Sequence, residues 1–389
     1  MKIGLSGPRR RFLARAAAGL ALFALGLWQV PHRWCGREGA AWYAGDAALQ
    51  GRLARGVERW VAAGLDRPDF TTGSPLFDGE WLFGTYLMAG LGFGQTAIEH
   101  PGWREAHAAL VRRCVERMQS PAVRAFDRER WGEDPLDSLD GDKGHVAYLG
   151  YFNLLLGLQR LVDPGAPSAD LNDRITAALA RRIERRPGLL LETYPREVYP
   201  VDNAAAIASI GLHARAAGKG RPGLLDRWAA RCRKAWIDPA TGLLYQAMSA
   251  HGALPYDRPR GSGTGLAAYF LSFADPALSR ELFEAVRREL AGSFLGFGVV
   301  REYPRGMSGP GDIDSGPIIL GWGVSSTGFA LAGSRIHGDR DLYRRIVGTV
   351  SLFGAPWDGG GRREFVTGGP LGNAMMFALM TAQPCGEAR

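Results

Sequence analysis

The chain has 389 residues, of which 46% are hydrophobic and 22% charged, a composition typical of globular proteins. This composition excludes a disordered chain, a collagen-like chain and a polytopic membrane protein. The net charge of +8 lies mostly in residues 1–60, which hold ten Lys and Arg against three Asp and Glu. Since the remaining residues are nearly neutral, the charge pattern argues against nucleic-acid binding by the folded part of the chain.

The four cysteines are far apart in the sequence, with no CxxC motif and no histidine at ligand spacing. This spacing argues against a zinc ribbon and against a disulfide framework. We therefore predict no metal site and no cofactor. The cysteines are Cys35, Cys114, Cys232 and Cys385.

The N-terminus has the pattern of a membrane segment. Residues 12–30 are apolar apart from Arg15, and a bilayer core needs about 20 such residues. Arg10-Arg11 followed by Phe12-Leu13 also resembles a twin-arginine export signal. Five positive charges before residue 16 favour a cytoplasmic N-terminus. Because no small-x-small cleavage site follows, we predict that residues 1–37 are an anchor that holds a periplasmic domain at the inner membrane. The alternatives are that the segment directs export of the domain to the periplasm, or that it is an apolar core helix.

Residues 38–389 are predicted to form one all-α domain, because the apolar period is helical and no Pro/Gly/Ser-rich linker divides the range. Twelve helices in six consecutive pairs indicate an (α/α)6 toroid, a barrel of six helix pairs. The predicted helices cover residues 38–64, 80–97, 103–118, 144–162, 168–186, 201–216, 222–236, 260–273, 276–291, 315–335, 340–352 and 370–382.

The two members of each pair differ in character. The first members are amphipathic and charged, as in residues 175–186 and 280–290. The second members are poor in charge and rich in Gly, Ala and aromatic residues. A helix that is apolar all round belongs in a core, so we predict an inner ring of second members and an outer ring of first members.

Polar residues gather where the chain leads into each predicted inner helix. In an alternating array, these segments lie at one end of the ring, where helix N-termini favour negative charge. N-capping explains some of them singly, and His145 can be either a cap or a cavity base. We interpret the whole set as the lining of a polar cavity. The predicted substrate-binding residues are Asp78, Glu80, His145, Tyr151, Tyr199, Asn203, Arg260, Glu302, Arg305 and Asn373.

The catalytic prediction is a pair of carboxylates. Glu192 lies in a segment stiffened by two prolines, and Asp312 and Asp314 precede the fifth inner helix. We predict Glu192 with Asp314 or Asp312 as the acid/base pair, and Asp202 as the third candidate. Carboxylates in different surroundings can have separated pKa values, which suits glycosidic cleavage, epimerisation or dehydration. Arg260 and Arg305 would bind substrate or keep one carboxylate ionised.

Five groups of residues carry a family resemblance: Trp131-Gly132 with Asp134-Pro135, the run from Tyr148 through Tyr151, Asn153 and Gly157, Glu192 with Asp202-Asn203, Ile237-Asp238-Pro239 with Gly242, and Ala274-Asp275-Pro276-Ala277. Through these motifs the chain resembles the linalool dehydratase-isomerase family over about residues 130–290. The resemblance implies an exported α6/α6 toroid and a terpene-alcohol type of chemistry. The family's histidine corresponds to Tyr151 here, its two cysteines to Leu191 and Asp202, and its glutamate to Glu192.

Three functions follow from these observations. The first is an extracytoplasmic carbohydrate-active enzyme, a glycoside hydrolase or else a lyase or epimerase, whose partner is a small-molecule or oligosaccharide substrate. The second is a dehydratase-isomerase acting on an alcohol, and the third is a non-catalytic glycan-binding envelope protein.

Overall fold

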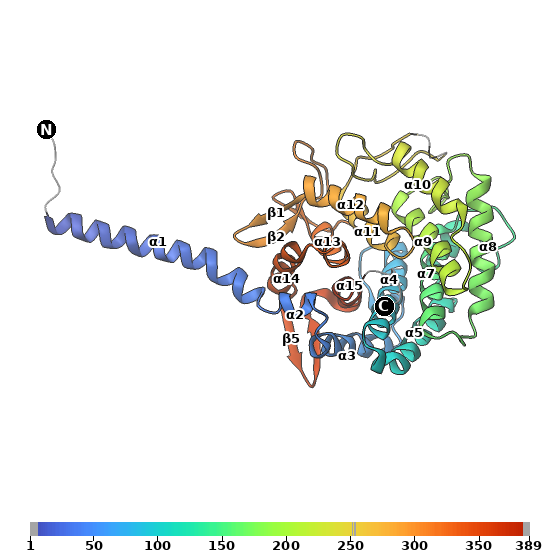
Figure 1. Ribbon diagram of the computed structural model, residues 1–389, viewed down its shortest axis with the longest axis horizontal. Helices are drawn as coiled ribbons and strands as arrows, with labels where there is room; N and C mark the ends of the chain where they lie inside the picture. The colour runs from blue at the N-terminus through green and yellow to red at the C-terminus, as the bar shows by residue number, and fades with distance from the viewer. Residues whose placement is uncertain (1–6, 251, 253, 384–389) are drawn as a thin grey trace.

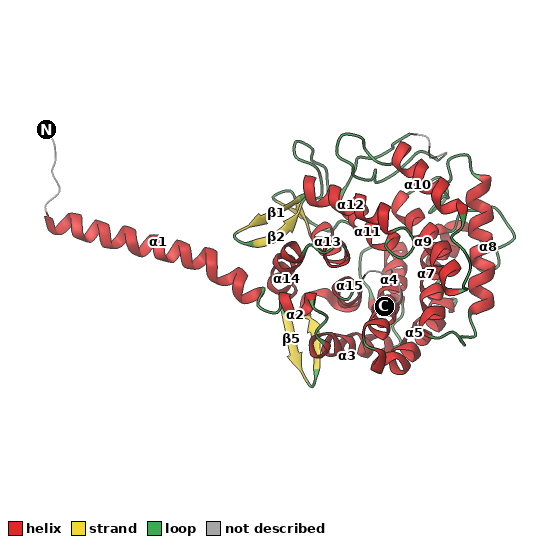
Figure 2. Ribbon diagram, viewed as in Figure 1, coloured by secondary structure: helices red, strands yellow, loops and turns green. Residues whose placement is uncertain are grey.

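The computed structural model of the chain describes residues 7–250, 252 and 254–383. The described part is mostly helical, with a few short strands and one long N-terminal helix (Figure 2). A continuous hydrophobic core contains buried residues from Trp42 through to Ala382.

The apolar helices are the second members of the predicted pairs, and at least half of the residues of each are buried. Each packs on the next in chain order, and the last packs back on the first. They are α4 (Pro75–Glu99), α7 (Val146–Val162), α9 (Pro200–Ala216), α11 (Gly261–Leu271), α13 (Val324–Ile336) and α15 (Gly369–Met380).

The charged helices lie at the periphery of the view in Figure 1, outside the apolar ones. Three of them begin at an aspartate whose side chain accepts a backbone N–H: Asp46 from Leu49 at 2.9 Å, and Asp275 from Leu278 and Asp339 from Leu342 at 3.0 Å each. They are α3 (Ala47–Ala63), α5 (Arg104–Gln119), α8 (Ala169–Arg185), α10 (Gly223–Ala235), α12 (Pro276–Glu289) and α14 (Arg340–Gly354).

The helix predicted over 38–64 is two helices, because α2 (Gly39–Tyr43) ends before Gly45 and α3 starts after it. Gly45 has a φ of 77°, and the side chain of Asp46 then caps α3 by accepting the N–H of Leu49 at 2.9 Å. The short α6 (Ala125–Trp131) and the 3-10 helices η1 (Arg67–Asp69), η2 (Pro101–Trp103) and η3 (Val366–Gly368) complete the helical elements of the described residues.

The fifth apolar helix begins at Val324, and the predicted start at residue 315 is wrong. Pro317 has no N–H to donate, and Gly316, Leu320 and Gly321 have positive φ values, so the chain cannot be helical there. The segment instead forms the antiparallel hairpin of β3 (Ile318–Ile319) and β4 (Trp322–Gly323).

Two more hairpins lie among the helices. The first pairs β1 (Ala291–Phe294) with β2 (Phe297–Val300), and the other pairs β5 (Pro356–Gly359) with β6 (Arg362–Phe365). All three hairpins have two-residue turns, and in each turn both residues have positive φ.

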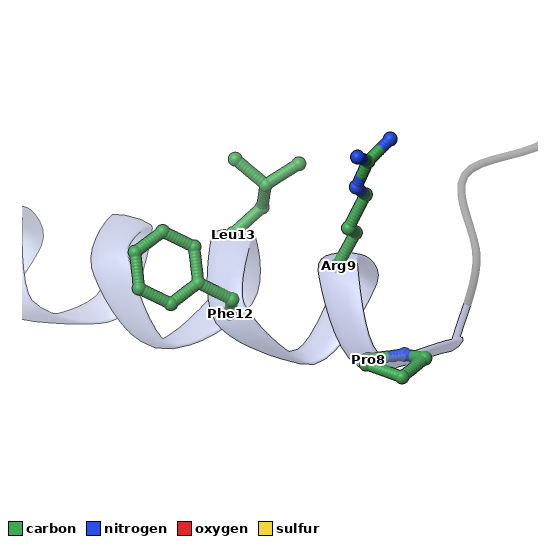
Figure 3. Close-up of a pocket in the computed structure, with 4 residues that line it drawn as sticks. All are labelled: Pro8, Arg9, Phe12 and Leu13. Atoms are coloured by element: carbon green, nitrogen blue, oxygen red, sulfur yellow. The ribbon is translucent and has the colours of Figure 1, made fainter.

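Helix α1 (Gly7–Cys35) projects away from the other helices, and only its C-terminal end packs on α14 (Figure 1). It is long and apolar enough to cross a membrane, and its apolar stretch is not buried. A recess between Pro8, Arg9, Phe12 and Leu13 lies on the surface of this helix alone (Figure 3). Because no other element contributes to that recess, it has no enclosed space for a substrate.

Candidate functional site

Three carboxylates from distant parts of the chain lie close together. Glu80 is in the second turn of α4, Asp202 is in the first turn of α9, and Asp314 is in the segment between β2 and β3. The charges of Asp314 and Asp202 both act on Glu80, and the charge of Asp202 acts on Asp314. We call these three residues the acid cluster.

Two members of the acid cluster have strongly raised pKa values. Burial is the main cause of the raised pKa of Glu80, and the negative charges of Asp314 and Asp202 add to it, so that the pKa is about 8. Asp314 is accessible to solvent, yet enough protein surrounds its carboxyl that desolvation, with the charges of Asp312 and Asp202, raises its pKa to about 7. Glu80 therefore holds a proton at neutral pH, and Asp314 is poised to exchange one.

Tyrosine hydroxyls hold the acid cluster in place. Tyr151 on α7 donates to Oδ1 of Asp202 at 2.5 Å, and Tyr194 donates to Oε1 of Glu80. Thr193 donates to the other oxygen of Asp202 at 2.7 Å. Burial raises the pKa of Asp202, and these two hydrogen bonds oppose that rise without cancelling it.

Tyr199 lies beside this group, and its hydroxyl donates to Oε2 of Glu197 at 3.2 Å. Glu197 also pairs with Arg130, whose guanidinium lies 4.9 Å from the ring centroid of Tyr194. The pKa of Tyr199 is raised by burial first and then by the negative charges of Glu197, Asp202 and Asp314, so the phenol remains a hydrogen-bond donor.

The structure gives the two neighbouring aspartates different roles. Asp312 pairs with the buried guanidinium of Arg260 and accepts the N–H of Ser315 at 2.8 Å. Although burial acts in the opposite direction, these contacts lower the pKa of Asp312. Arg260 also bonds Asp257 at 2.5 Å, so both of its terminal nitrogens are occupied. Asp312 is therefore an ionised partner of Arg260, and Asp314 is the carboxyl that can carry a proton.

Glu302 is fully buried behind this ion pair. Its Oε1 accepts the hydroxyl of Ser262 at 2.5 Å, and its Oε2 has no hydrogen-bond partner among the described residues. Burial raises the pKa of Glu302. Arg305, in the same segment, is exposed to solvent.

Glu192 is not brought into the acid cluster. Its Oε1 accepts the N–H of Arg196 at 2.9 Å, and its backbone oxygen lies 3.5 Å from the N–H of Val146. Among the described residues, the charge of Glu192 is not one of those that act on Glu80, Asp202 or Asp314. The contacts of Glu192 therefore stabilise a turn beside the site.

Several residues predicted to bind substrate instead tie the start of a helix to the preceding segment. Asn203 accepts the N–H of Leu191 at 2.7 Å and donates to its oxygen at 2.9 Å, and Asn373 does the same to Phe365 at 2.7 and 3.0 Å. Three more apolar helices have the same kind of bond. The side chain accepts a backbone N–H of the preceding segment: Thr264 from Leu244, Thr327 from Val300 and Asp78 from Thr72.

In five of the six apolar helices, one side chain near the start thus bonds the backbone of the preceding segment; we call such a side chain a latch. The sequence does not reveal this regularity, because the residue type differs from helix to helix.

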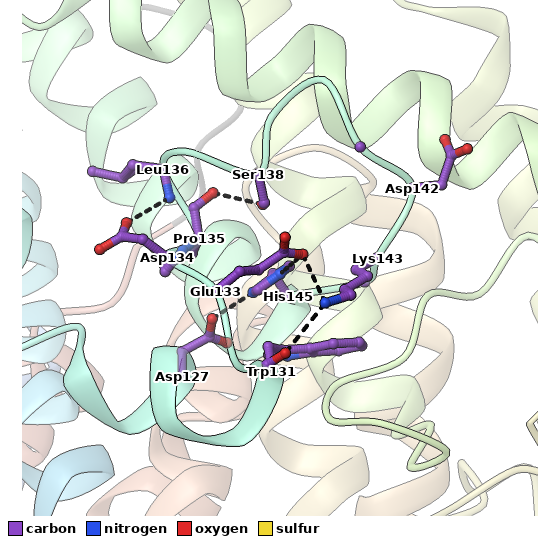
Figure 4. A network of polar contacts seen from close by, with 12 residues as sticks. Asp127, Trp131, Glu133, Asp134, Pro135, Leu136, Ser138, Asp142, Lys143 and His145 are labelled. Atoms are coloured by element: carbon purple, nitrogen blue, oxygen red, sulfur yellow. Dashed lines mark hydrogen bonds and ion pairs between the residues drawn. The ribbon is translucent and has the colours of Figure 1, made fainter.

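His145 is the residue directly before α7; its side chain does not cap the helix but lies in a buried network of its own (Figure 4). Its Nδ1 lies 2.6 Å from Oδ2 of Asp127, and its Nε2 lies 3.3 Å from Oε1 of Glu133. The Trp131 ring lies 4.6 Å from the imidazole, centroid to centroid. Because both ring nitrogens have partners and the side chain is fully buried, His145 does not line the acid cluster.

Sequence reasoning missed Tyr194 and Arg130 as members of the site. Tyr194 was recognisable only by its place in the proline-stiffened segment, and Arg130 had no signal because it lies in a short helix that was not predicted.

An open recess of about 690 Å³ adjoins the Arg260 ion pair on the side of Asp257. It is lined by Asp238, Tyr245, residues 255–259 and residues 306–308.

The described residues contain no group of three His, Cys, Asp or Glu side chains that could hold a metal ion. The thiols of Cys114 and Cys232 are buried, and burial raises the pKa of each, while Cys385 lies outside the described residues. In the comparisons with known proteins, no family model and no curated protein matches this chain.

Proposed function

We propose that this chain is a general acid/base enzyme that cleaves a glycosidic bond in a hydroxylated substrate at the acid cluster. The observation that carries the proposal is the gathering of Glu80, Asp202 and Asp314 with two pKa values raised to about 8 and about 7. A carboxyl whose pKa is raised to near neutrality holds a proton at the pH of the reaction and can still give it up.

The division of roles follows from the surroundings of each carboxyl. Asp314 is accessible to solvent and gives its proton to the leaving oxygen of the substrate. We assign to Asp202, whose two oxygens accept the hydroxyls of Tyr151 and Thr193, the acceptance of a proton from the attacking water. Glu80 keeps its proton beneath them, because three neighbouring carboxylates cannot all ionise.

The surroundings favour a hydroxylated substrate. Tyr151 and Tyr199 present phenols next to the acid cluster, and aromatic rings beside carboxylates suit a sugar, which offers both apolar faces and hydroxyl groups. The alternative is a dehydratase-isomerase-like hydro-lyase, in which the same acid protonates an alcohol. Tyr151 supports this alternative, because it lies at the position that corresponds to the histidine of the linalool dehydratase-isomerase family. A non-catalytic glycan-binding protein is the third possibility.

The proposal includes the architecture and the location. We infer a closed (α/α)6 toroid over residues 38–389, supported by the packing of α15 on α4. In such a ring the apolar helices all start at one end, where the acid cluster lies. We place the domain in the periplasm, held at the inner membrane by α1, on the strength of the five positive charges before residue 16.

The test is a substrate screen with the full chain in detergent, using an oligosaccharide library and mass spectrometry. Hydrolysis gives products whose masses sum to that of the substrate plus one water. Asp314→Asn should lower the rate of product formation by about 10²-fold or more, whereas Glu105→Gln, the same chemical change on the exposed surface of α5, should leave it unchanged. An alcohol that loses water would favour the hydro-lyase, and saturable binding without any product would favour the glycan-binding protein.

A further inference from the structure

The C-terminal end of α1 has the residue pattern of a helix at a bilayer surface. Trp28 and Trp34 are 50% and 67% exposed on either side of Val30, the last residue of the apolar stretch. Arg33 and Arg37 follow within two turns and are exposed. Aromatic residues with adjacent basic residues are typical of the level at which a membrane helix leaves the hydrocarbon.

The β1–β2 hairpin lies at this same level. His32 is two residues beyond Val30, about 3 Å along the helix axis, and its ring lies 6.1 Å from the ring of Phe297, centroid to centroid. The backbone of Gly296, in the turn of the hairpin, packs directly on the His32 ring. Figure 1 shows the hairpin beside the place where α1 meets the other helices.

The β3–β4 hairpin is joined to the first one. The rings of Phe294 and Trp322 lie 4.9 Å apart, and Arg301, which follows β2, pairs with Trp322. The tips of the two hairpins have the same sequence pattern, an apolar residue, Leu, Gly and an aromatic residue. We call Phe294, Leu295, Ile319 and Leu320 the hairpin tips; they are 45%, 50%, 55% and 73% exposed.

The residue type at these turns is costly for the backbone. Leu295 and Leu320 have φ values of 50° and 54°, and two-residue turns with positive φ strongly prefer Asn or Gly at this position. The third hairpin, β5–β6, follows the preference with Gly360 and Gly361. Neither folding nor solubility in water explains an exposed leucine at both positions, whereas contact with an apolar medium does.

We propose that the hairpin tips dip into the lipid bilayer beside α1, so that the folded domain rests on the membrane through a second, non-spanning contact. The occupant of this surface is lipid, because the hairpin that packs on His32 lies at the level where α1 leaves the hydrocarbon. Amphipathic elements at this depth bury apolar side chains at the boundary between headgroups and acyl chains. The inference stands apart from the proposed chemistry and concerns only where the domain sits.

The experiment reconstitutes the full chain in vesicles of phosphatidylethanolamine and phosphatidylglycerol that carry a phospholipid with a diazirine in its acyl chain. After illumination, mass spectrometry maps the labelled residues. We expect labelling in α1 and at the hairpin tips, above the level at Leu254 and Tyr256. These two residues are 68% and 84% exposed and belong to the segment between α10 and α11, which lie away from α1 in Figure 1. Hairpin labelling equal to that of Leu254 and Tyr256, no labelling of α1, or crosslinks to a second copy of the chain would overturn the proposal.

A double variant, Leu295→Asn with Leu320→Asn, separates the lipid contact from folding. Asn suits a positive φ, so both turns should be kept and thermal unfolding should not occur earlier. Labelling of the hairpin tips should fall to the level at Leu254 and Tyr256, while labelling of α1 remains. The matched control is Gly360→Asn, at a position with open space, which should leave all labelling unchanged. Undiminished labelling of the hairpin segments in the double variant would contradict the proposal.

Discussion

Replacing Glu80 by Gln should remove a pH-dependent loss of stability. The pKa of Glu80 is about 8 in the folded chain, against an ordinary value of 4.5, so the folded state binds more protons than the unfolded state between these two pH values. The stability contributed by Glu80 is therefore complete below pH 4.5 and is lost as the pH rises to about 8. The glutamine variant has no proton to lose, and its amide oxygen can still accept the hydroxyl of Tyr194.

The size of the effect follows from the pKa difference. One pKa unit corresponds to about 1.4 kcal/mol, so the shift of Glu80 corresponds to at most about 5 kcal/mol in the free energy of unfolding. Water that reaches the partly accessible side chain makes the real value smaller. The difference between variant and wild type should thus grow by a few kcal/mol between pH 5 and pH 9, in favour of the variant.

The assay is urea unfolding of the full chain in detergent at a series of pH values, with Glu105→Gln as the matched control. The control should follow the wild-type curve, because Glu105 is exposed on α5. Parallel curves for wild type and Glu80→Gln would refute the reasoning, since they would mean that Glu80 ionises alike in the folded and unfolded states.

Three further predictions concern the neighbours of the acid cluster. Asp314→Asn should lower turnover by about 10²-fold or more, because it removes a positioned acid. In the wild type, kcat/KM should fall above about pH 7 as Asp314 loses its proton. A wild-type pH profile in which kcat/KM does not fall above about pH 7 would exclude this role for Asp314. Arg260→Met should reduce the free energy of unfolding by about 1–2 kcal/mol, because it leaves Asp257 and Asp312 unpaired; the loss is smaller than for a fully buried pair, since water reaches both carboxylates. Arg305→Met at an exposed position should change the free energy of unfolding by less than about 0.5 kcal/mol, and equal melting temperatures for the two variants would contradict the ion-pair argument. Asn203→Ala should lower the free energy of unfolding by about 1–3 kcal/mol, because it leaves the buried N–H of Leu191 without a partner. Thermal unfolding measures this loss, and an unchanged melting temperature would show that the Asn203 bonds do not stabilise the fold.

The positions of most helices could be read from the sequence, because the signals are local. Alternating sets of charged and apolar helices follow from hydrophobic periodicity, and Asp275 and Asp339 mark helix starts through their own side chains. The N-terminal helix follows from a run of apolar residues alone, and the structure confirms a long helix whose apolar stretch is not buried. These features depend on residues within one or two turns of each other.

Only the tertiary structure decided which polar residues form the candidate site. Asp78, Asn203 and Asn373 looked like cavity residues, but each bonds backbone groups of the segment before its helix. The start of α13 was missed because the turn at Leu320 is stabilised by pairing of two strands, which outweighs the helical pattern of the segment.

The protonation states also depend on contacts between distant parts of the chain. Glu80 receives the hydroxyl of Tyr194, 114 residues away, and feels the charges of Asp202 and Asp314. Asp312 and Asp314 look alike in the sequence, yet Arg260 lowers the pKa of the first, and burial with neighbouring carboxylates raises that of the second. Desolvation and charge–charge interactions act through space, so only the folded chain determines which carboxyl can carry the proton.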